Sequence, residues 1–309
     1  NYVPASDASV KRTTVHIWTC ENTIQWLYGG GNAADVGNSN TPTSDSVIID
    51  GGRIEWVFGG GNGHSETDNH NLPYLEGEQC TTTNTGIVCP DYNPGANISG
   101  DASVTYHAGY ITRLFGGSNE YGNISGNKNV SILNDGVCLE TNHHIVELYA
   151  GNNKAPIVGN TGVTFTMPCR SNSPCPIDYI FGGSRMADIE GDVVLNIEGG
   201  LYNYVFGGNN LSGTIDGNVT LNLYGGTILQ AAFGGNKGGF FGETFYDGGS
   251  ITGNITVNVE DLCECPLSVK DVFGAGDLAK YTAPAVTADR AFNPMVNVNH
   301  ICPDNDNNI

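Results

Sequence analysis

Four side chains that could bind a metal ion stand at every second residue: His64, Glu66, Asp68 and His70. In an extended chain, alternate residues point to the same face, so these imidazoles and carboxylates would lie together. Histidine nitrogens and carboxylate oxygens suit zinc or another divalent cation. A solvated polar loop carries the same residue types equally well. A divalent cation is the one cofactor that the sequence suggests.

The nine cysteines form a second chemically distinctive set. None belongs to a Cys-x-x-Cys pair, which disfavours zinc-ribbon and thioredoxin-like sites and favours disulfides in an oxidising compartment. Because nine is an odd number, at least one thiol is free or pairs with another molecule. The disulfide candidates are Cys80, Cys89, Cys138, Cys169, Cys175, Cys265 and Cys302.

Position suggests partners for these cysteines. Cys80 and Cys89 bracket a short segment, so the sequence predicts a local disulfide between them. Further partners are suggested only as alternatives: Cys138 with Cys169 or Cys175, a local Cys169–Cys175 bond as the rival, and Cys265 with Cys302.

A glycine-rich stretch, residues 238–250, contains four aromatic side chains: Phe240, Phe241, Phe245 and Tyr246. Exposed rings on such a loop would suit a sugar ring or a protein partner. The alternative is a loop that folds back on the flank of the molecule as a lid.

These residues are set within a repeat. Eight copies of an aromatic residue followed by a glycine-rich turn run through the chain, as in Val205-Phe206-Gly207-Gly208-Asn209-Asn210. Short stretches of period-2 alternation separate the copies. The 25 residues from Phe181 to Phe206 fit one turn of a parallel β-helix, and longer spacings fit turns with insertions. We therefore predict an all-β fold: a single-stranded parallel β-helix, or solenoid, of about eight coils with two long loop insertions, right-handed as parallel crossovers generally are.

Stacking of the coils turns each repeat position into a column. We expect the aromatic position to form an internal ladder of rings, and the position four residues later to form a ladder of side-chain amides. The aromatic column is Tyr28, Phe58, Phe115, Tyr149, Phe181, Phe206, Phe233 and Phe273. The polar column is Asn32, Asn62, Asn119, Asn153, Arg185, Asn210, Lys237 and Asp277.

The extent of the repeat sets the predicted domain boundaries. Residues 1–13 are an N-terminal arm or cap, residues 14–277 are the β-helix with insertions at about 63–95 and 238–250, and residues 278–309 are a C-terminal cap or tail. A chain that opens at Asn1, without Met or a signal-like segment, is expected of a mature or excised piece.

Composition narrows the class of partner. A net charge of −20 disfavours nucleic acids and anionic membrane surfaces, both of which attract Lys and Arg. No run of 18 apolar residues is present, so no membrane span is expected. The coils also lack the paired carboxylates with nearby Arg or Lys that β-helix lyases and glycosidases use. An enzyme is therefore the less favoured hypothesis.

The motif Val-Phe-Gly-Gly-Gly-Asn, followed by Ile-x-Gly-Asn-Val-x-Leu-Asn-Ile-x-Gly-Gly, resembles the repeats of large surface-exposed or secreted β-helix proteins of Bacteroidetes-type bacteria. The likeness covers about Val15 to Asp277. It implies an adhesin-like or structural module, extracellular or at the cell surface, that presents loops to a glycan or protein. The cysteines and the two long insertions depart from that pattern. The alternatives are a carbohydrate-active enzyme, either a polysaccharide lyase or a glycoside hydrolase, and a self-assembling filament or matrix subunit.

Overall fold

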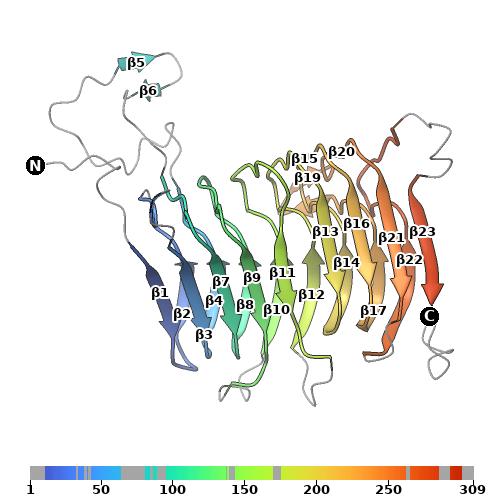
Figure 1. The fold of residues 1–309 in the computed structure, drawn as a ribbon, viewed down its shortest axis with the longest axis horizontal. Helices are drawn as coiled ribbons and strands as arrows, with labels where there is room; N and C mark the ends of the chain where they lie inside the picture. The colour runs from blue at the N-terminus through green and yellow to red at the C-terminus, as the bar shows by residue number, and fades with distance from the viewer. Residues whose placement is uncertain are drawn as a thin grey trace, which may run out of the picture.

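A computed structural model describes residues 11–32, 34–37, 40, 43–63, 81–83, 86–88, 95–136, 138, 143–169, 175–261, 265–284 and 293–300. These residues form a parallel β-helix whose coils follow one another along its long axis (Figure 1). The described residues contain no α-helix, and so no helix long and apolar enough to cross a membrane. The predicted fold class is confirmed.

One wall of the solenoid is an eight-stranded parallel sheet, which we call the long sheet. Its strands pair in the order β2-β4-β8-β10-β12-β14-β17-β22, one from each successive coil. They are β2 (Thr23–Tyr28), β4 (Arg53–Phe58), β8 (Tyr110–Phe115), β10 (His144–Tyr149), β12 (Pro176–Phe181), β14 (Leu201–Phe206), β17 (Gly226–Phe233) and β22 (Leu267–Phe273).

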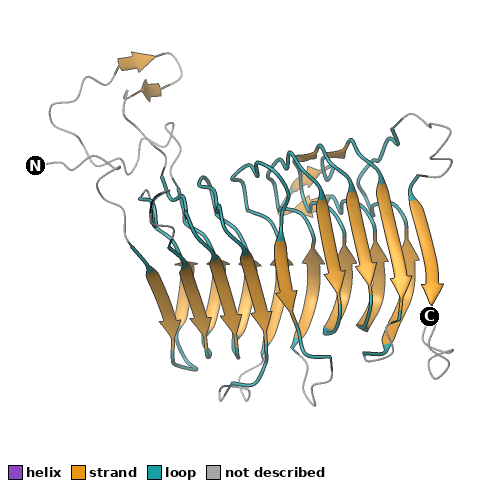
Figure 2. Ribbon diagram, viewed as in Figure 1, coloured by secondary structure: helices purple, strands orange, loops and turns teal. Residues whose placement is uncertain are grey.

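The opposite wall, which we call the front wall, consists of two sheets. In Figure 2 its strands run in the opposite direction to those of the long sheet behind them. The five-stranded sheet contains β1 (Thr13–Ile17), β3 (Asp45–Ile49), β7 (Ala102–Tyr106), β9 (Lys128–Ile132) and β11 (Val163–Thr166). The four-stranded sheet contains β13 (Val193–Ile197), β16 (Val219–Leu223), β21 (Ile255–Glu260) and β23 (Met295–His300).

A third, narrower wall completes each coil. It is made of single parallel bridges and of the pair β15 (Thr214–Ile215) and β20 (Ser250–Ile251). Two antiparallel hairpins project from the coils: β5 (Thr81–Thr83) with β6 (Gly86–Val88), and β18 (Gly239–Phe241) with β19 (Thr244–Tyr246).

Two disulfides divide the solenoid into halves of the same design. Cys20, in the turn after β1, bonds Cys138, in the turn after β9 three coils later. Cys169, after β11, bonds Cys265, after β21, again three coils later. We call these bonds the two clasps, and we call coils 1–4 (β1 to β10) and coils 5–8 (β11 to β22) the first and second halves.

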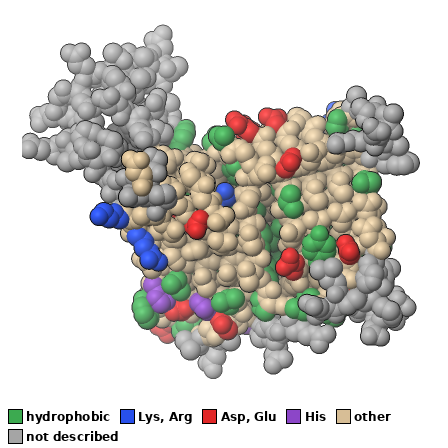
Figure 3. All heavy atoms as spheres, viewed as in Figure 1, with side chains coloured by type: hydrophobic (Ala, Val, Ile, Leu, Met, Phe, Trp, Pro, Cys, Tyr) green, Lys and Arg blue, Asp and Glu red, His purple; other side chains and the backbone are tan. Residues whose placement is uncertain are grey.

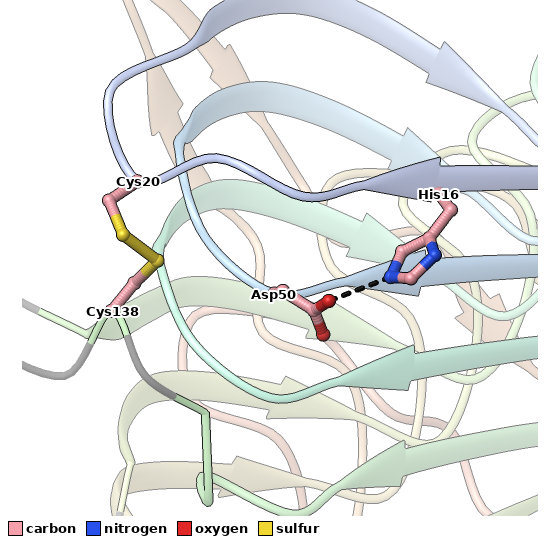
Figure 4. The surroundings of a disulfide bond; sticks show 4 residues. All are labelled: His16, Cys20, Asp50 and Cys138. Atoms are coloured by element: carbon pink, nitrogen blue, oxygen red, sulfur yellow. Dashed lines mark hydrogen bonds and ion pairs between the residues drawn. A yellow bond between two sulfur atoms is a disulfide. The ribbon is translucent and has the colours of Figure 1, made fainter.

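The coils beneath each clasp turn with glycine because the bridging cysteines leave no room for a side chain. A Cβ at Gly51 would lie 2.5 Å from Cys138 Sγ, and one at Gly225 would lie 2.7 Å from Cys265 Cβ. Figure 4 shows the first clasp beside the pair His16 and Asp50, whose Nε2 and Oδ2 atoms are 2.7 Å apart. Two such bonds indicate an oxidising environment, outside a cell or in a periplasm.

The main core lies between the long sheet and the front wall. Alternate residues of the front strands point inward, as in β13, where Val193, Leu195 and Ile197 are buried while their neighbours are exposed. The long sheet contributes two residues per strand, such as Ile111 and Leu114 of β8.

Candidate functional site

The aromatic column lies on the outer face of the long sheet, away from the main core. Ile111 and Leu114 are three residues apart yet both point into the main core, so the alternation breaks between them. Phe115 follows Leu114 and therefore points to the outer face. The aromatic residues accordingly form a cluster of their own. The expected ladder is present, but on the opposite face from the main core.

All eight rings stack in one continuous column. Successive ring centroids are 4.5–5.3 Å apart, from Tyr28 on Phe58 to Phe233 on Phe273, with rings nearly parallel. The six rings from Phe58 to Phe233 are buried. The spacing matches the ~4.8 Å between neighbouring strands, so each coil adds one ring.

The polar column closes one flank of the rings. Asn62 donates to Asn32 at 2.6 Å, Asn119 to Asn62 at 2.7 Å and Asn153 to Asn119 at 2.8 Å. Arg185 continues the ladder by donating from Nη1 to Asn153 Oδ1 at 3.2 Å. The predicted ladder is thus confirmed from Asn32 to Arg185, whereas Asn210, the next member of the column, donates to the Tyr149 hydroxyl at 2.6 Å instead.

The other flank is closed by a row of side chains two residues before each ring, which we call the outer row. Strand register aligns Trp26, Trp56, Arg113, Glu147, Tyr179 and Tyr204 across successive strands. Trp26 stacks on Trp56 at 4.8 Å, and Tyr179 stacks on Tyr204 at 5.3 Å. The outer row thus presents two aromatic pairs, with a cation and a carboxylate between them.

The two charged residues of the outer row bind each other. Arg113 Nε donates to Glu147 Oε2 at 2.8 Å, and the Arg113 guanidinium lies 4.4 Å from the centroid of the Trp56 ring. Glu147 also accepts from the Tyr149 hydroxyl at 3.0 Å. Burial raises the pKa of Tyr149 well above its usual value, so this phenol stays protonated and acts as a donor.

The hairpin β18–β19 belongs to coil 7, yet its Phe241 reaches side chains of coils 3 and 5. The Phe241 ring centroid lies 4.5 Å from the Arg185 guanidinium carbon and 5.4 Å from that of Arg113. Phe240 packs edge-on against Phe245 at 5.2 Å, and these two rings are 72% and 52% exposed. The segment therefore folds back over the flank and also exposes rings, and the binding of a partner by these rings stays a prediction.

The predicted metal ligands His64, Glu66, Asp68 and His70 lie outside the described residues. Among the residues that the structure describes, no group of three or more His, Cys, Asp or Glu is arranged to hold a metal ion. The metal site therefore stays a prediction.

The disulfide partners differ from those proposed from the sequence. Cys138 bonds Cys20, rather than Cys169 or Cys175, and Cys169 bonds Cys265. Cys175 is a free, buried thiol, and burial raises its pKa to about 12.

The alternative Cys265–Cys302 bond is also wrong, because Cys265 bonds Cys169. Cys302 itself lies outside the described residues, as do Cys80 and Cys89. The proposed pairs joined neighbouring or local positions, whereas the actual bonds pass over two intervening coils.

The outer row was missed from the sequence, although the repeat contains a signal for it. The residue two before each aromatic of the column is Trp, Trp, Arg, Glu, Tyr and Tyr in the first six copies. A residue that is large or charged at one fixed repeat position forms a line on a solenoid surface.

On the face shown in Figure 3, basic side chains are few and lie mostly near the end that contains β1, while acidic side chains are spread along the length.

No family model, curated protein or solved structure matches this chain. Its function is therefore inferred from the fold and from the outer face of the long sheet.

Proposed function

We propose that this protein is an adhesin-like β-helix module, extracellular or at the cell surface, that binds a glycan on the outer face of the long sheet. The observation that carries the proposal is the outer row, in which two stacked aromatic pairs and an Arg–Glu pair lie in one line across the strands. The exposed Trp26 ring suits the apolar face of a sugar ring, and charged hydrogen-bonding groups suit its hydroxyls.

The dimensions of the outer row favour a polymer. The six strands that carry the row, at ~4.8 Å spacing, extend for roughly 24 Å from β2 to β14, which suits an extended chain better than a single small molecule. The rings beneath the row are stacked and buried, so the surface is rigid before the ligand arrives and little ordering entropy is lost on binding.

Binding is favoured over catalysis because two carboxylates near the middle of this face are engaged. Glu147 binds Arg113 and Tyr149, and Asp178 lies 3.0 Å from His144 and accepts from Asn203 at 2.7 Å. A glycosidase needs two carboxylates facing one glycosidic bond. A lyase or hydrolase activity at Glu147 is the alternative that the test must separate.

The test incubates the full chain with a panel of soluble and insoluble polysaccharides. Depletion of protein and release of reducing or unsaturated ends are measured in the same tubes. Binding without release supports the proposal, and release of products replaces it with the enzymatic alternative. The absence of both binding and release would overturn both hypotheses.

Two exposed tryptophans supply a matched pair of variants. Trp26 lies in the outer row at its exposed end, whereas Trp18 lies in the turn after β1, against His16. Trp26→Ala should weaken glycan binding by about tenfold, in line with ~1–3 kcal/mol for one stacked ring. Trp18→Ala should leave binding unchanged. Equal effects of the two variants would contradict binding at the outer row.

A second candidate function is end-to-end self-association. The last ring of the column, Phe273, is 48% exposed. Val296 and Val298 of β23 align with the buried Val257 and Val259 but are themselves exposed. An apolar strand edge of this kind favours pairing with another copy. Electron microscopy and sedimentation over a concentration series would show filaments, or only single rods if this candidate is wrong.

A further inference from the structure

The outer face of the long sheet gathers cations and rings in an otherwise acidic protein. The chain has 12 Lys and Arg against 32 Asp and Glu. Arg113 and Arg185 both lie over the Trp56 ring, at 4.4 and 5.4 Å, and Lys237 lies 5.4 Å from the Tyr179 ring. Both guanidinium groups also contact Phe241, so they are enclosed between two aromatic rings.

Arg185 is the unusual member of this group. It stands in a column whose four first-half positions and next neighbour, Asn210, all hold Asn, and it is only 5% exposed. Its Nη1 donates to Asn153 Oδ1 and to the sulfur of Met186, both at 3.2 Å. An amide oxygen and a thioether do not neutralise a guanidinium, so this cation is buried largely on neutral partners.

The surroundings disfavour the charge of Arg185. Burial is the largest influence and lowers the pKa of Arg185; Tyr149 and Glu147 act in the opposite direction, and the neighbouring Arg113 lowers this pKa further. Glu147 already binds Arg113 Nε at 2.8 Å. Glu147 is thus already engaged by Arg113 and Tyr149, whereas Arg185 is hydrogen-bonded to neutral groups. An incoming anion would relieve both the desolvation and the repulsion.

We propose that the glycan bound at this face is acidic, and that its carboxylate or sulfate groups bind Arg185 and Arg113 in the place that the Phe241 ring now covers. This inference rests on the proposed function and specifies its ligand. Planar guanidinium groups bind carboxylates and sulfates through paired hydrogen bonds, and the Trp56 ring beneath them helps to hold both groups in place.

The hairpin joins the coil through two pairs of glycines. It lies between Gly238-Gly239 and Gly248-Gly249, all with φ between 71° and 115°, a region that only glycine enters freely. Its base is held by backbone bonds from Gly238 N to Asn210 O at 2.7 Å and from Gly248 N to Leu211 O at 2.9 Å. Rotation at the glycine pairs would lift Phe241 while the base stays attached.

The test compares polymers that differ only in charge. The full chain is titrated with polygalacturonate and its methyl-esterified form, and with dextran sulfate and dextran, at low and high salt. We expect at least one acidic polymer to bind about tenfold more tightly than its neutral partner, with the preference reduced by salt. The carboxylate and sulfate pairs distinguish the two kinds of anion.

Variants locate the effect. Arg185→Gln should remove about tenfold of the affinity for the acidic polymer and none of that for the neutral one, and Arg185→Lys should retain part of it. Lys154→Gln is the control, because Lys154 is a surface cation bound to Glu120 at 2.7 Å. Phe241→Ala should strengthen acidic binding a few-fold by uncovering the guanidinium groups. Thermal unfolding of each variant checks that it folds.

Each result has a distinct meaning. Equal binding of acidic and neutral polymers would overturn the inference while leaving the proposed glycan function intact. An acidic preference that survives Arg185→Gln would also overturn it. No binding to any polymer would overturn both. Weaker acidic binding by Phe241→Ala would show that the ring belongs to the binding surface and would remove the covering role.

Discussion

The two halves of the solenoid have the same kind of clasp and share one ring column. They differ in the first inward-facing residue of each front-wall strand. In the second half this row is apolar throughout: Val163 is half-buried, and Val193, Val219 and Ile255 are buried. In the first half the aligned positions are Thr13, Asp45, Ala102 and Lys128. One scaffold therefore tolerates a polar inner row in one half and an apolar one in the other.

Asp45 shows what the difference costs. Its side chain is 1% exposed, and neither carboxylate oxygen is hydrogen-bonded to another described residue. Burial raises its pKa to about 8. The same desolvation lowers the pKa of Lys128. The first half is thus expected to be the less stable half, and the one that responds to pH.

The rings where the halves meet should matter most for stability. Phe181 stacks between Tyr149 of the first half and Phe206 of the second and is fully buried. Phe181→Ala should lower the free energy of unfolding by about 3–5 kcal/mol, the usual cost of removing a buried Phe side chain. Phe273→Ala, at the exposed end, should cost much less. Chemical denaturation measures both, and equal losses would show that the column does not couple the halves.

Removing either clasp tests whether the halves are equivalent. The clasps span 118 and 96 residues, and loop-closure entropy for such lengths is nearly equal, at most about 4–5 kcal/mol. The pairs Cys20→Ala with Cys138→Ala, and Cys169→Ala with Cys265→Ala, should therefore lose about 2–4 kcal/mol each. Cys175→Ala, which keeps both clasps, is the control. A far larger loss of unfolding free energy on removal of one clasp would mean that the coils it joins pack less stably without it.

The buried carboxyl predicts the sign of the pH dependence. Unfolded Asp45 ionises near pH 3.9, and folded Asp45 near pH 8, so between these values the folded state holds a proton that the unfolded state releases. Stability from this group is complete below about pH 4 and is lost as pH rises to about 8, by no more than ~1.4 kcal/mol per unit.

Two substitutions at Asp45 check this contribution against pH. Asp45→Asn should flatten the pH profile of the unfolding midpoint, and Asp45→Val, which copies the second half, should flatten it and raise the midpoint. A wild-type profile without this slope would show that the carboxyl is not buried in solution.

The smallest expected difference concerns the outer surface of the front wall. In the second half, Asn222 donates to Asn196 at 2.8 Å and accepts from Asn258 at 2.7 Å. The aligned positions of the first half are Ile48, Thr105 and Ser131, which form no such ladder. Asn222→Thr should cost about 1 kcal/mol, since each bond contributes ~0.5–1.5 kcal/mol net. A loss below ~0.3 kcal/mol would show that the ladder follows from the strand register and contributes little to stability.

The fold could be predicted because each coil repeats the same local demands. The aromatic, the glycine pair and the Asn recur together, and stacking leaves each of them one neighbour above and one below. The outward direction of the rings could not be predicted, since it depends on a break in alternation that the sequence does not mark. Ile111 and Leu114 are both inward only because two residues between them share the outer side.

The site was only partly predictable for a related reason. Phe241 could be recognised as unusual, but its contacts with Arg113 and Arg185 depend on how far the hairpin extends along the axis. Cys20 and Cys138 occupy matching turns of their coils, which the repeat makes visible. The sequence does not show that the bond between them passes over two intervening coils. Contacts between residues of non-adjacent coils depend on the length and direction of the turns, which the repeat pattern does not specify.

The clasps give the protein a particular response to mechanical force. A chain pulled from its two ends transmits tension through Cys20–Cys138 and Cys169–Cys265, so the residues enclosed by each bond bear no load. At up to ~3.5 Å per extended residue, the two loops withhold roughly 700 Å of length. Under tension, only the link between the clasps and the segments outside them can be drawn out, and reduction would release the rest.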